Sequence, residues 1–155
     1  MTLIVGNDAD LISKARDIRH RVFVTEQKIP ARLDLDGLDA SSHHALMTRE
    51  GAPVGTARLT VTRPGHAVLA RVAVLPEFRG RGAASRIIDV LISHAATLNL
   101  STIEIHAHEH LRKYYESFGF VYVRDVEVVG THQLIEMRLA LASSPARGKT
   151  GTIGS

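Results

Sequence analysis

The sequence contains no cysteine and no long apolar run. The absence of cysteine excludes disulfide bonds, thiolate metal sites and a cysteine nucleophile. No apolar run approaches the ~20 residues that a membrane span requires. The N-terminal residues 1–6 also lack the basic start and the length of a secretory signal. We therefore expect a cytoplasmic protein without a membrane partner.

The excess of positive over negative charge is also small. The net charge is +3 over 155 residues, and Arg147 and Lys149 supply two of these units, which leaves about +1 for the rest (3 minus 2). This near-neutral body gives no support for a nucleic-acid partner. The length and the hydrophobic content of 45% fit one globular domain, expected over residues 2–141. Residues 142–155 are rich in glycine, serine and threonine and predict a flexible tail.

Periodicity and turn residues predict the element order β-α-β-β-β-α-β-α-β-β. Helical spacing of apolar residues predicts helices over 9–25, 82–98 and 108–118. Strands are predicted at 2–5, 43–49, 54–63, 67–75, 102–107, 120–129 and 134–141, with a hairpin turn at 50–53. Residues 26–42 show no sustained period and predict a long loop. This order is typical of an α/β (α+β) fold with a mixed, mostly antiparallel sheet and helices on both faces.

The segment 71–86 carries the clearest chemical signal. An apolar strand stops at Pro76, a basic turn follows with Gly80 and Gly82, and a helix then begins. Glycine permits positive φ and close approach of a ligand, and the free amides of a helix N-terminus bind phosphate. The segment has neither the Gly-Lys-Ser/Thr end of a P-loop nor the third glycine of a dinucleotide fingerprint. It predicts a phosphate cradle of another kind, the alternative being a basic turn that only caps a helix.

Two motifs carry a resemblance to a known family. The pattern Arg79-x-x-Gly82-x-Ala84 resembles the pyrophosphate-binding motif of the GNAT superfamily of N-acetyltransferases. The segment 114–120, Tyr-Tyr-Glu-Ser-Phe-Gly-Phe, is similar to the aromatic-Tyr-Glu-x-x-Gly-Phe motif of the same family. Together with the element order over 2–141, they imply the acyl-CoA N-acyltransferase fold with splayed central strands. N-terminal patterns such as Arg19-x-x-Val22-Phe23 resemble the ElaA-like branch, and in part the acyl-homoserine-lactone synthases.

The resemblance implies acetyl-CoA as co-substrate, without a metal. The implied coenzyme-binding residues are those of the strand, the turn and two later positions: Val72, Ala73, Val74, Arg79, Gly80, Arg81, Gly82, Ala83, Ala84, Ser85, His108 and Tyr115. The turn would hold the pyrophosphate, and the strand backbone would pair with the pantetheine arm and offer an N–H to the thioester carbonyl. His108 stands where many members have asparagine. Tyr115 is the implied general acid that protonates the departing thiolate.

The proton acceptor for the amine is less specific. Glu26 is the first candidate for a general base, with a surface carboxylate as the alternative, and the strand histidines His43, His44 and His106 are further candidates. The acidic loop residues Asp34, Asp36 and Asp39 would bind the acceptor or order the loop. Arg19 and Arg58 would pair with that loop or bind an acceptor carboxylate.

The run His106-x-His108-x-His110 is not expected to bind a metal. The first two alternate at a strand end and the third begins a helix, so the rings need not converge. Without cysteine, an acyl-enzyme has no support. The sequence thus predicts direct acetyl transfer, in a ternary complex, to a primary amine of a small-molecule or peptide acceptor, in a chain that could form a homodimer. The alternatives are a non-catalytic CoA-binding sensor or interaction module, and a longer-chain acyltransferase related to the lactone synthases.

Overall fold

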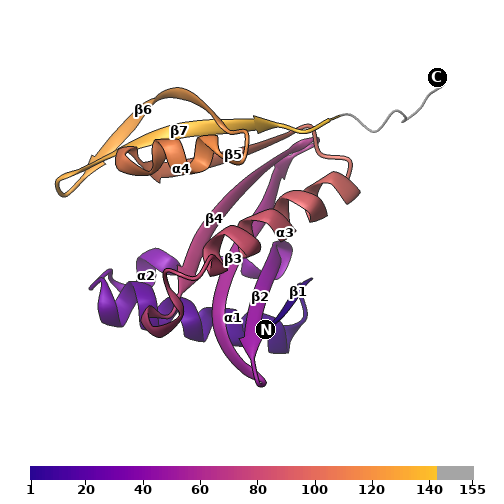
Figure 1. The fold of residues 1–155 in the computed structure, drawn as a ribbon, viewed down its shortest axis with the longest axis vertical. Helices are drawn as coiled ribbons and strands as arrows, with labels where there is room; N and C mark the ends of the chain where they lie inside the picture. The colour runs from indigo at the N-terminus through magenta and orange to yellow at the C-terminus, as the bar shows by residue number, and fades with distance from the viewer. Residues whose placement is uncertain (143–155) are drawn as a thin grey trace. The chain divides into compact units, whose positions relative to one another are not determined.

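The computed structural model describes residues 1–142, so the predicted tail falls outside the described residues from 143 onward. Seven strands form one sheet in the order β1-β2-β3-β4-β5-β7-β6 (Figure 1). The strands are β1 (Thr2–Gly6), β2 (His43–Arg49), β3 (Ala52–Arg63), β4 (His66–Val74), β5 (Thr102–His108), β6 (Val121–Val129) and β7 (His132–Ala140). Strands β4 and β5 pair in parallel, whereas β1 with β2, β2 with β3, β5 with β7 and β6 with β7 pair antiparallel. The mixed, mostly antiparallel sheet confirms the predicted fold class.

Helical segments connect the strands in the predicted order. They are α1 (Ala9–Arg19), the π-helix η1 (His20–Glu26), α2 (Ala31–Asp34), η2 (Asp39–Ser41), η3 (Pro76–Phe78), α3 (Ala83–Thr97), η4 (Glu109–Leu111) and α4 (Arg112–Glu116). Among the described residues, no helix is long and apolar enough to cross a membrane. The chain divides into two compact units: Met1–Thr60 with Leu69–His94, and Val61–Val68 with the described residues from Ala95 onward.

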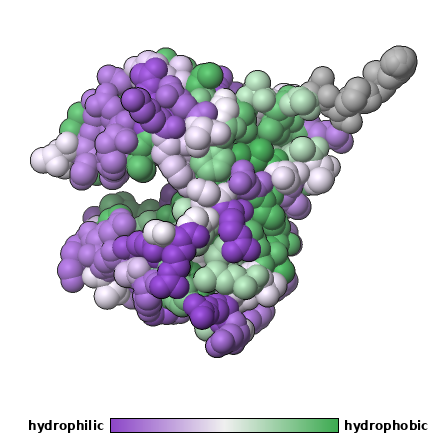
Figure 2. All heavy atoms as spheres, viewed as in Figure 1, coloured by the Kyte–Doolittle hydropathy of each residue, from purple (hydrophilic) through white to green (hydrophobic). Residues whose placement is uncertain are grey.

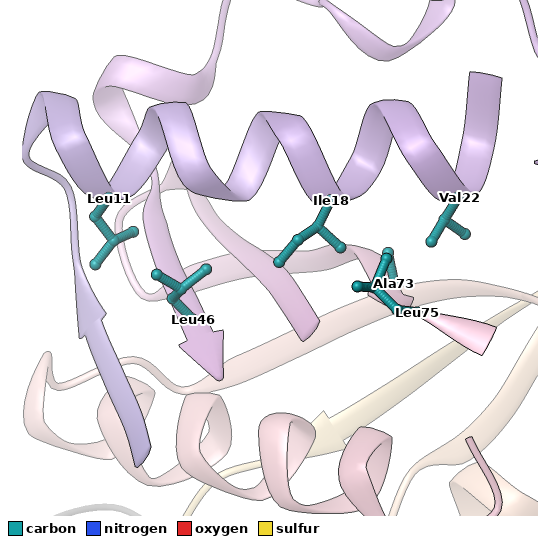
Figure 3. Close-up of a cluster of buried hydrophobic side chains, with 6 residues drawn as sticks. All are labelled: Leu11, Ile18, Val22, Leu46, Ala73 and Leu75. Atoms are coloured by element: carbon teal, nitrogen blue, oxygen red, sulfur yellow. The ribbon is translucent and has the colours of Figure 1, made fainter. Parts of the chain in front are cut away.

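In the first unit, α1 packs along one face of the strands. Asp8 caps it by accepting a hydrogen bond from the N–H of Leu11 at 2.9 Å. Its apolar side chains recur at helical spacing, so one stripe faces the sheet. That stripe and the strand residues beneath it form a buried cluster of Leu11, Ile18, Val22, Leu46, Ala73 and Leu75 (Figure 3).

The predicted first helix is π-helical over its last six residues and over Glu26, one residue beyond the prediction. The N–H of Gln27 donates to the carbonyl of Val22, five residues earlier, at 3.0 Å. Such wide turns are rare and occur frequently at functional sites. The helical stretch therefore ends at Glu26, one residue beyond the prediction, but with a different winding over His20–Glu26.

Helix α3 covers the opposite face of the first unit. Leu46, which packs against α1, pairs with Thr56, so the neighbouring pair Met47 and Gly55 points to the other side of the sheet. A Cβ atom at Gly55 would lie 2.7 Å from Cδ1 of Ile87, a residue of α3. Helices therefore lie on both faces, as predicted, and Gly55 allows α3 to approach closely.

Two predicted segments of the first unit are wrong in detail. The predicted loop 26–42 contains the short helices α2 and η2, because buried Asp34 and Asp39 bind arginine side chains and fix the backbone around them. The hairpin turn comprises only Glu50 and Gly51, both with positive φ, and β3 already begins at Ala52. Two consecutive left-handed residues match the twist of a two-residue hairpin.

Hydrophilic residues cover the visible face around α2 (Figure 2).

The second unit is built on the β5-β7-β6 part of the sheet. Alternate residues Ile103, Ile105 and Ala107 of β5 are buried. The predicted helix 108–118 is corrected to η4 followed by α4, because β5 continues to His108, where it still pairs with Leu134. After α4 the chain turns at Gly119, whose φ of 101° suits glycine.

Candidate functional site

The predicted phosphate cradle is an exposed turn with two left-handed glycines. Gly80 has φ 75° and Gly82 has φ 76°. A Cβ atom at either position would meet nothing within 4 Å, so open space lies beside the backbone. The N–H of Arg86 donates to the carbonyl of Gly82 at 3.1 Å and begins the hydrogen bonding of α3. The turn thus leads directly into the first turn of α3, and the start of a helix is a position at which backbone amides can bind an anion.

Arg79 connects this turn to the π-helix. Its Nη1 and Nη2 donate to the two carboxylate oxygens of Glu26, each at 2.7 Å, and its Nε donates to the carbonyl of Val74 at 2.8 Å. The hydrogen bond from Arg79 lowers the pKa of the Glu26 carboxyl. In this arrangement Glu26 is the ion-pair partner of Arg79, and its lowered pKa makes it a weaker base. Its role as general base stays a prediction.

The strand segment before the turn contains a left-handed residue that is not glycine. Arg71 has φ 59° in the middle of β4, a conformation that costs side-chain-bearing residues free energy. Its Nε donates to Oδ1 of Asp34 at 3.1 Å, and its Nη2 donates to Oδ2 of Asp36 at 3.3 Å. These contacts hold the irregular backbone directly ahead of Val72–Val74. The sequence reasoning missed this feature, because nothing in an arginine signals positive φ.

The acidic segment is fixed by a buried network of arginines and aspartates. Arg19 is 1% exposed and donates to Asp34 through Nε and Nη2, and to Asp39 through Nη1 at 2.8 Å. Arg58 donates to both oxygens of Asp36, at 2.9 and 2.6 Å, and to Asp39 at 3.1 Å. Of the alternatives predicted for these residues, the structure has the arginines as partners of the acidic segment and the aspartates as the residues that order it.

These ion pairs keep the carboxylates ionised. The hydrogen bonds from Arg58 lower the pKa of Asp36 to about 2. Burial alone would raise the pKa of Asp39, but hydrogen bonds from Arg19 and Arg16 outweigh it and hold that pKa far below its usual range. Neither carboxylate is therefore suited to accept a proton near neutral pH.

The histidines predicted as alternative bases lie in different surroundings. His44 is completely buried, with Nε2 2.8 Å from the carbonyl of Asp39, and burial lowers its pKa. His43 is half-buried, with Nδ1 3.1 Å from Nε2 of His94, and burial followed by the charge of His94 lowers its pKa. His106 is exposed, and its Nε2 lies 2.7 Å from Oε2 of Glu104. His44 has a structural role, whereas His43 and His106 retain accessible rings.

Tyr115 lies in α4 of the second unit, inside an aromatic cluster. Its side chain is buried, and its ring meets those of Tyr114 and Phe120 edge to face, with centroids 5.2 and 5.9 Å apart. Burial, with a smaller effect of Tyr114, raises the pKa of the phenol to about 12. The hydroxyl therefore stays protonated at physiological pH and can donate a hydrogen bond.

His108, the predicted coenzyme contact, lies at the end of β5 beside two other histidines. Its ring stacks on that of His132 with centroids 4.5 Å apart, and the centroid of His110 is 5.5 Å away. The sequence reasoning missed His132 because it placed this residue in the turn before β7. The pairing of β5 with β7 brings these residues together: His108 pairs with Leu134, so continuing the same register sets residue 110 opposite residue 132.

The chain is similar to several known proteins. Residues 13–141 match a family model described as an acetyltransferase (GNAT) domain. The chain is 36% identical over 113 residues to the protein sll0451 of Synechocystis, covering 70% of this chain and 72% of that protein. Its fold matches an acyl-CoA N-acyltransferase from Pseudomonas aeruginosa with a TM-score of 0.81 and 31% identity, covering 90% and 99% of the two chains. It matches Escherichia coli ElaA with a TM-score of 0.80 and 24% identity, covering 89% and 98%.

Proposed function

Because this chain belongs to the GNAT acetyltransferase family, we propose that it transfers an acetyl group from acetyl-CoA to a primary amine by direct attack. The observation that carries the proposal is the turn at Gly80 and Gly82. Both glycines are left-handed, both have open space where a side chain would stand, and α3 begins immediately after them. This is the arrangement that a diphosphate needs in order to accept hydrogen bonds from backbone amides.

The coenzyme-binding residues proposed here follow from that turn. The amides of residues 80–85 would bind the diphosphate, while the exposed guanidinium of Arg81 adds positive potential. The backbone of Val72, Ala73 and Val74 would pair with the pantetheine arm, and one N–H would stabilise the oxyanion of the attacked carbonyl. The irregular backbone at Arg71 supports this role, because a left-handed residue inside a strand changes the direction of the backbone groups that follow it.

The reaction forms a C–N bond and breaks the C–S bond of the thioester. The proton that leaves the amine nitrogen is balanced by the proton gained by the thiolate. In this proposal Glu26 collects the first proton, directly or through water, and Tyr115 supports the thiolate. A phenol pKa of about 12 lies about 3.5 units above a thiol near ~8.5, so complete proton transfer costs about 5 kcal/mol. We therefore assign Tyr115 a hydrogen bond to the developing thiolate as its main contribution, while the departing thiolate takes its proton from water.

One observation favours a second candidate function. Glu26 is bound on both oxygens by Arg79, which lowers its pKa. A chain with the cradle but without a competent base would bind the coenzyme without turning it over. This is the alternative of a CoA-binding sensor or interaction module.

Two measurements on the purified full-length protein test the proposal. Calorimetry with acetyl-CoA is expected to show one site per chain. Thiol release with a panel of primary amines is expected to exceed the rate without amine. Failure to bind acetyl-CoA would overturn both candidate functions, and binding without amine-dependent release across the panel would favour the sensor.

A further inference from the structure

We propose that His108, His110 and His132 form a binding site for a divalent late first-row transition ion such as Zn²⁺. One ring nitrogen from each side chain lies within 4.8 Å of the others. The inference departs from the sequence expectation that this histidine run binds no metal. It goes beyond the proposed function, because it involves neither the glycine turn nor the transfer of an acetyl group, although His108 is also the implied coenzyme contact.

The backbone explains why three separate positions meet. His108 is the last residue of β5, His132 is the first of β7, and the two strands pair antiparallel. The short helix η4 turns the chain directly after β5 and carries His110. Each imidazole therefore comes from a defined backbone position at the same end of one strand pair. His106, two residues earlier in the run, belongs elsewhere, since its Nε2 bonds Glu104.

The distances are compatible with coordination. A tetrahedral ion with Zn–N bonds of ~2.0–2.1 Å sets its ligand nitrogens about 3.3 Å apart. Closing from 4.8 Å or less to that spacing requires rotation of the imidazoles about their side-chain torsions. His110 and His132 are exposed, so both rings have room to rotate and an ion has a path of entry. Three protein ligands would leave the fourth position open to water.

The donor set selects the class of ion. All three donors are imidazole nitrogens, which suit Zn²⁺, Cu²⁺ and Ni²⁺, whereas Mg²⁺ and Ca²⁺ require oxygen. A second cluster in the same unit, Glu104 with His106 and Glu136, does not carry the same argument. There, Arg124 and Arg138 lie 2.9 and 3.0 Å from the carboxylate oxygens of Glu136 and already neutralise it. The three residues of the histidine cluster include no arginine or lysine.

Zn²⁺ alone, added to the untagged full-length protein without coenzyme, tests the site. Calorimetry is expected to give one ion per chain, and Co²⁺ used as a visible probe is expected to show absorption bands of low-symmetry coordination. His132→Gln and His110→Gln should each weaken Zn²⁺ binding by about tenfold or more, because each removes one of three ligands. The matched control is His20→Gln. It removes an exposed histidine at the start of η1, in the first unit, and should leave the affinity for Zn²⁺ unchanged.

Each outcome decides the proposal. Weakening in both cluster variants but not in the control supports it, provided that the metal-free variants keep the melting temperature of the parent. Equal Zn²⁺ affinity in His132→Gln and the parent would overturn it, as would equal losses in the cluster variants and in His20→Gln. Absence of binding to the parent at millimolar Zn²⁺ would also overturn it. A loss of acetyl transfer is not a readout here, so failure of the proposed function leaves this test intact.

Discussion

The Nε atom of Arg71 donates a hydrogen bond to Oδ1 of Asp34 at 3.1 Å, while the backbone of Arg71 has φ 59°. The strained residue of β4 is thus anchored by a carboxylate 37 positions earlier in the chain. The ion pair offsets part of the cost of the left-handed backbone, and the next residues begin the segment proposed to face the pantetheine arm.

Replacements at Arg71 should show the strain directly. Both Arg71→Gly and Arg71→Ala lose the ion pairs, but only glycine relieves the left-handed backbone, so the glycine variant should be more stable by about 1 kcal/mol. At Arg63, a strand residue that lacks positive φ, the order should reverse and alanine should be favoured. Urea denaturation measures both pairs. The same order at both positions would contradict a left-handed Arg71.

Substitution in the turn should remove coenzyme binding. Gly82→Asp places bulk and negative charge against the proposed phosphate position, and calorimetry should detect no binding of acetyl-CoA. Gly51→Asp is the matched control, since Gly51 also has positive φ, 82°, and open space around its Cβ position, but lies in a hairpin turn. Its affinity for acetyl-CoA should equal that of the parent. Parent-like affinity in Gly82→Asp would remove the cradle assignment.

Loss of the Tyr115 hydroxyl should affect turnover rather than binding. Tyr115→Phe is expected to lower kcat by about 10²-fold, with little change in the affinity for acetyl-CoA. The neighbouring Tyr114→Phe serves as the control and should keep kcat within a few fold. Steady-state kinetics and calorimetry separate the two effects. Unchanged turnover in Tyr115→Phe would exclude the proposed hydrogen bond to the developing thiolate as a contribution to catalysis.

The role of Glu26 can be decided by which kinetic constant changes. If it collects the amine proton, Glu26→Gln should lower kcat by about 10²-fold or more. If it only holds Arg79, the same variant should change KM for acetyl-CoA while kcat stays near the parent value. Glu77→Gln removes another carboxylate whose charge acts on Arg79 and is the control. If Glu26→Gln and Glu77→Gln change the kinetic constants equally, the effect comes from the loss of negative charge near Arg79, and Glu26 has no specific role.

Acid should weaken the fold through the arginine–aspartate network. The folded-state pKa of Asp36 is about 2, and that of Asp39 is also lowered, whereas an unfolded aspartate titrates near ~3.9. As pH falls, these aspartates take up protons in the unfolded chain before they do so in the folded protein. The free energy of unfolding that their ion pairs contribute is therefore complete above pH ~4 and declines as pH falls toward ~2. Urea midpoints measured across this range should fall. Compared with the parent, the decline should be smaller in Asp36→Asn and the same in Asp10→Asn, whose carboxylate is exposed and pairs with Lys14.

The sequence predicted much of the fold because its signals are local. The alternation in β5, the apolar stripe of α1 and the turn at Gly80 and Gly82 all depend on residues close together in the chain. The α3 helix was predicted within one residue at each end for the same reason.

The remaining features depend on contacts between distant segments. Arg19 and Asp39 are ordinary surface residue types, and only the packing of α1 beside the acidic segment buries their ion pair. The approach of His132 to His108 requires the register of β5 with β7, which composition does not give. The π-helical winding of His20–Glu26 has no distinct composition either, because the same apolar spacing fits an α-helix.

That winding ties the chain length of the first helix to the position of its final carboxylate. A π-helical turn holds one residue more than an α-helical turn, so deleting a single residue from 20–26 would restore regular winding. The seven π-helical residues sweep about the same total angle as six α-helical residues, so the end of the helix would keep roughly its present rotation. Glu26 would therefore stay near Arg79 despite the change in length. The same deletion within the regular winding of α1 would instead rotate everything after it by roughly a quarter turn, at 3.6 residues per turn, and would carry Glu26 away from Arg79.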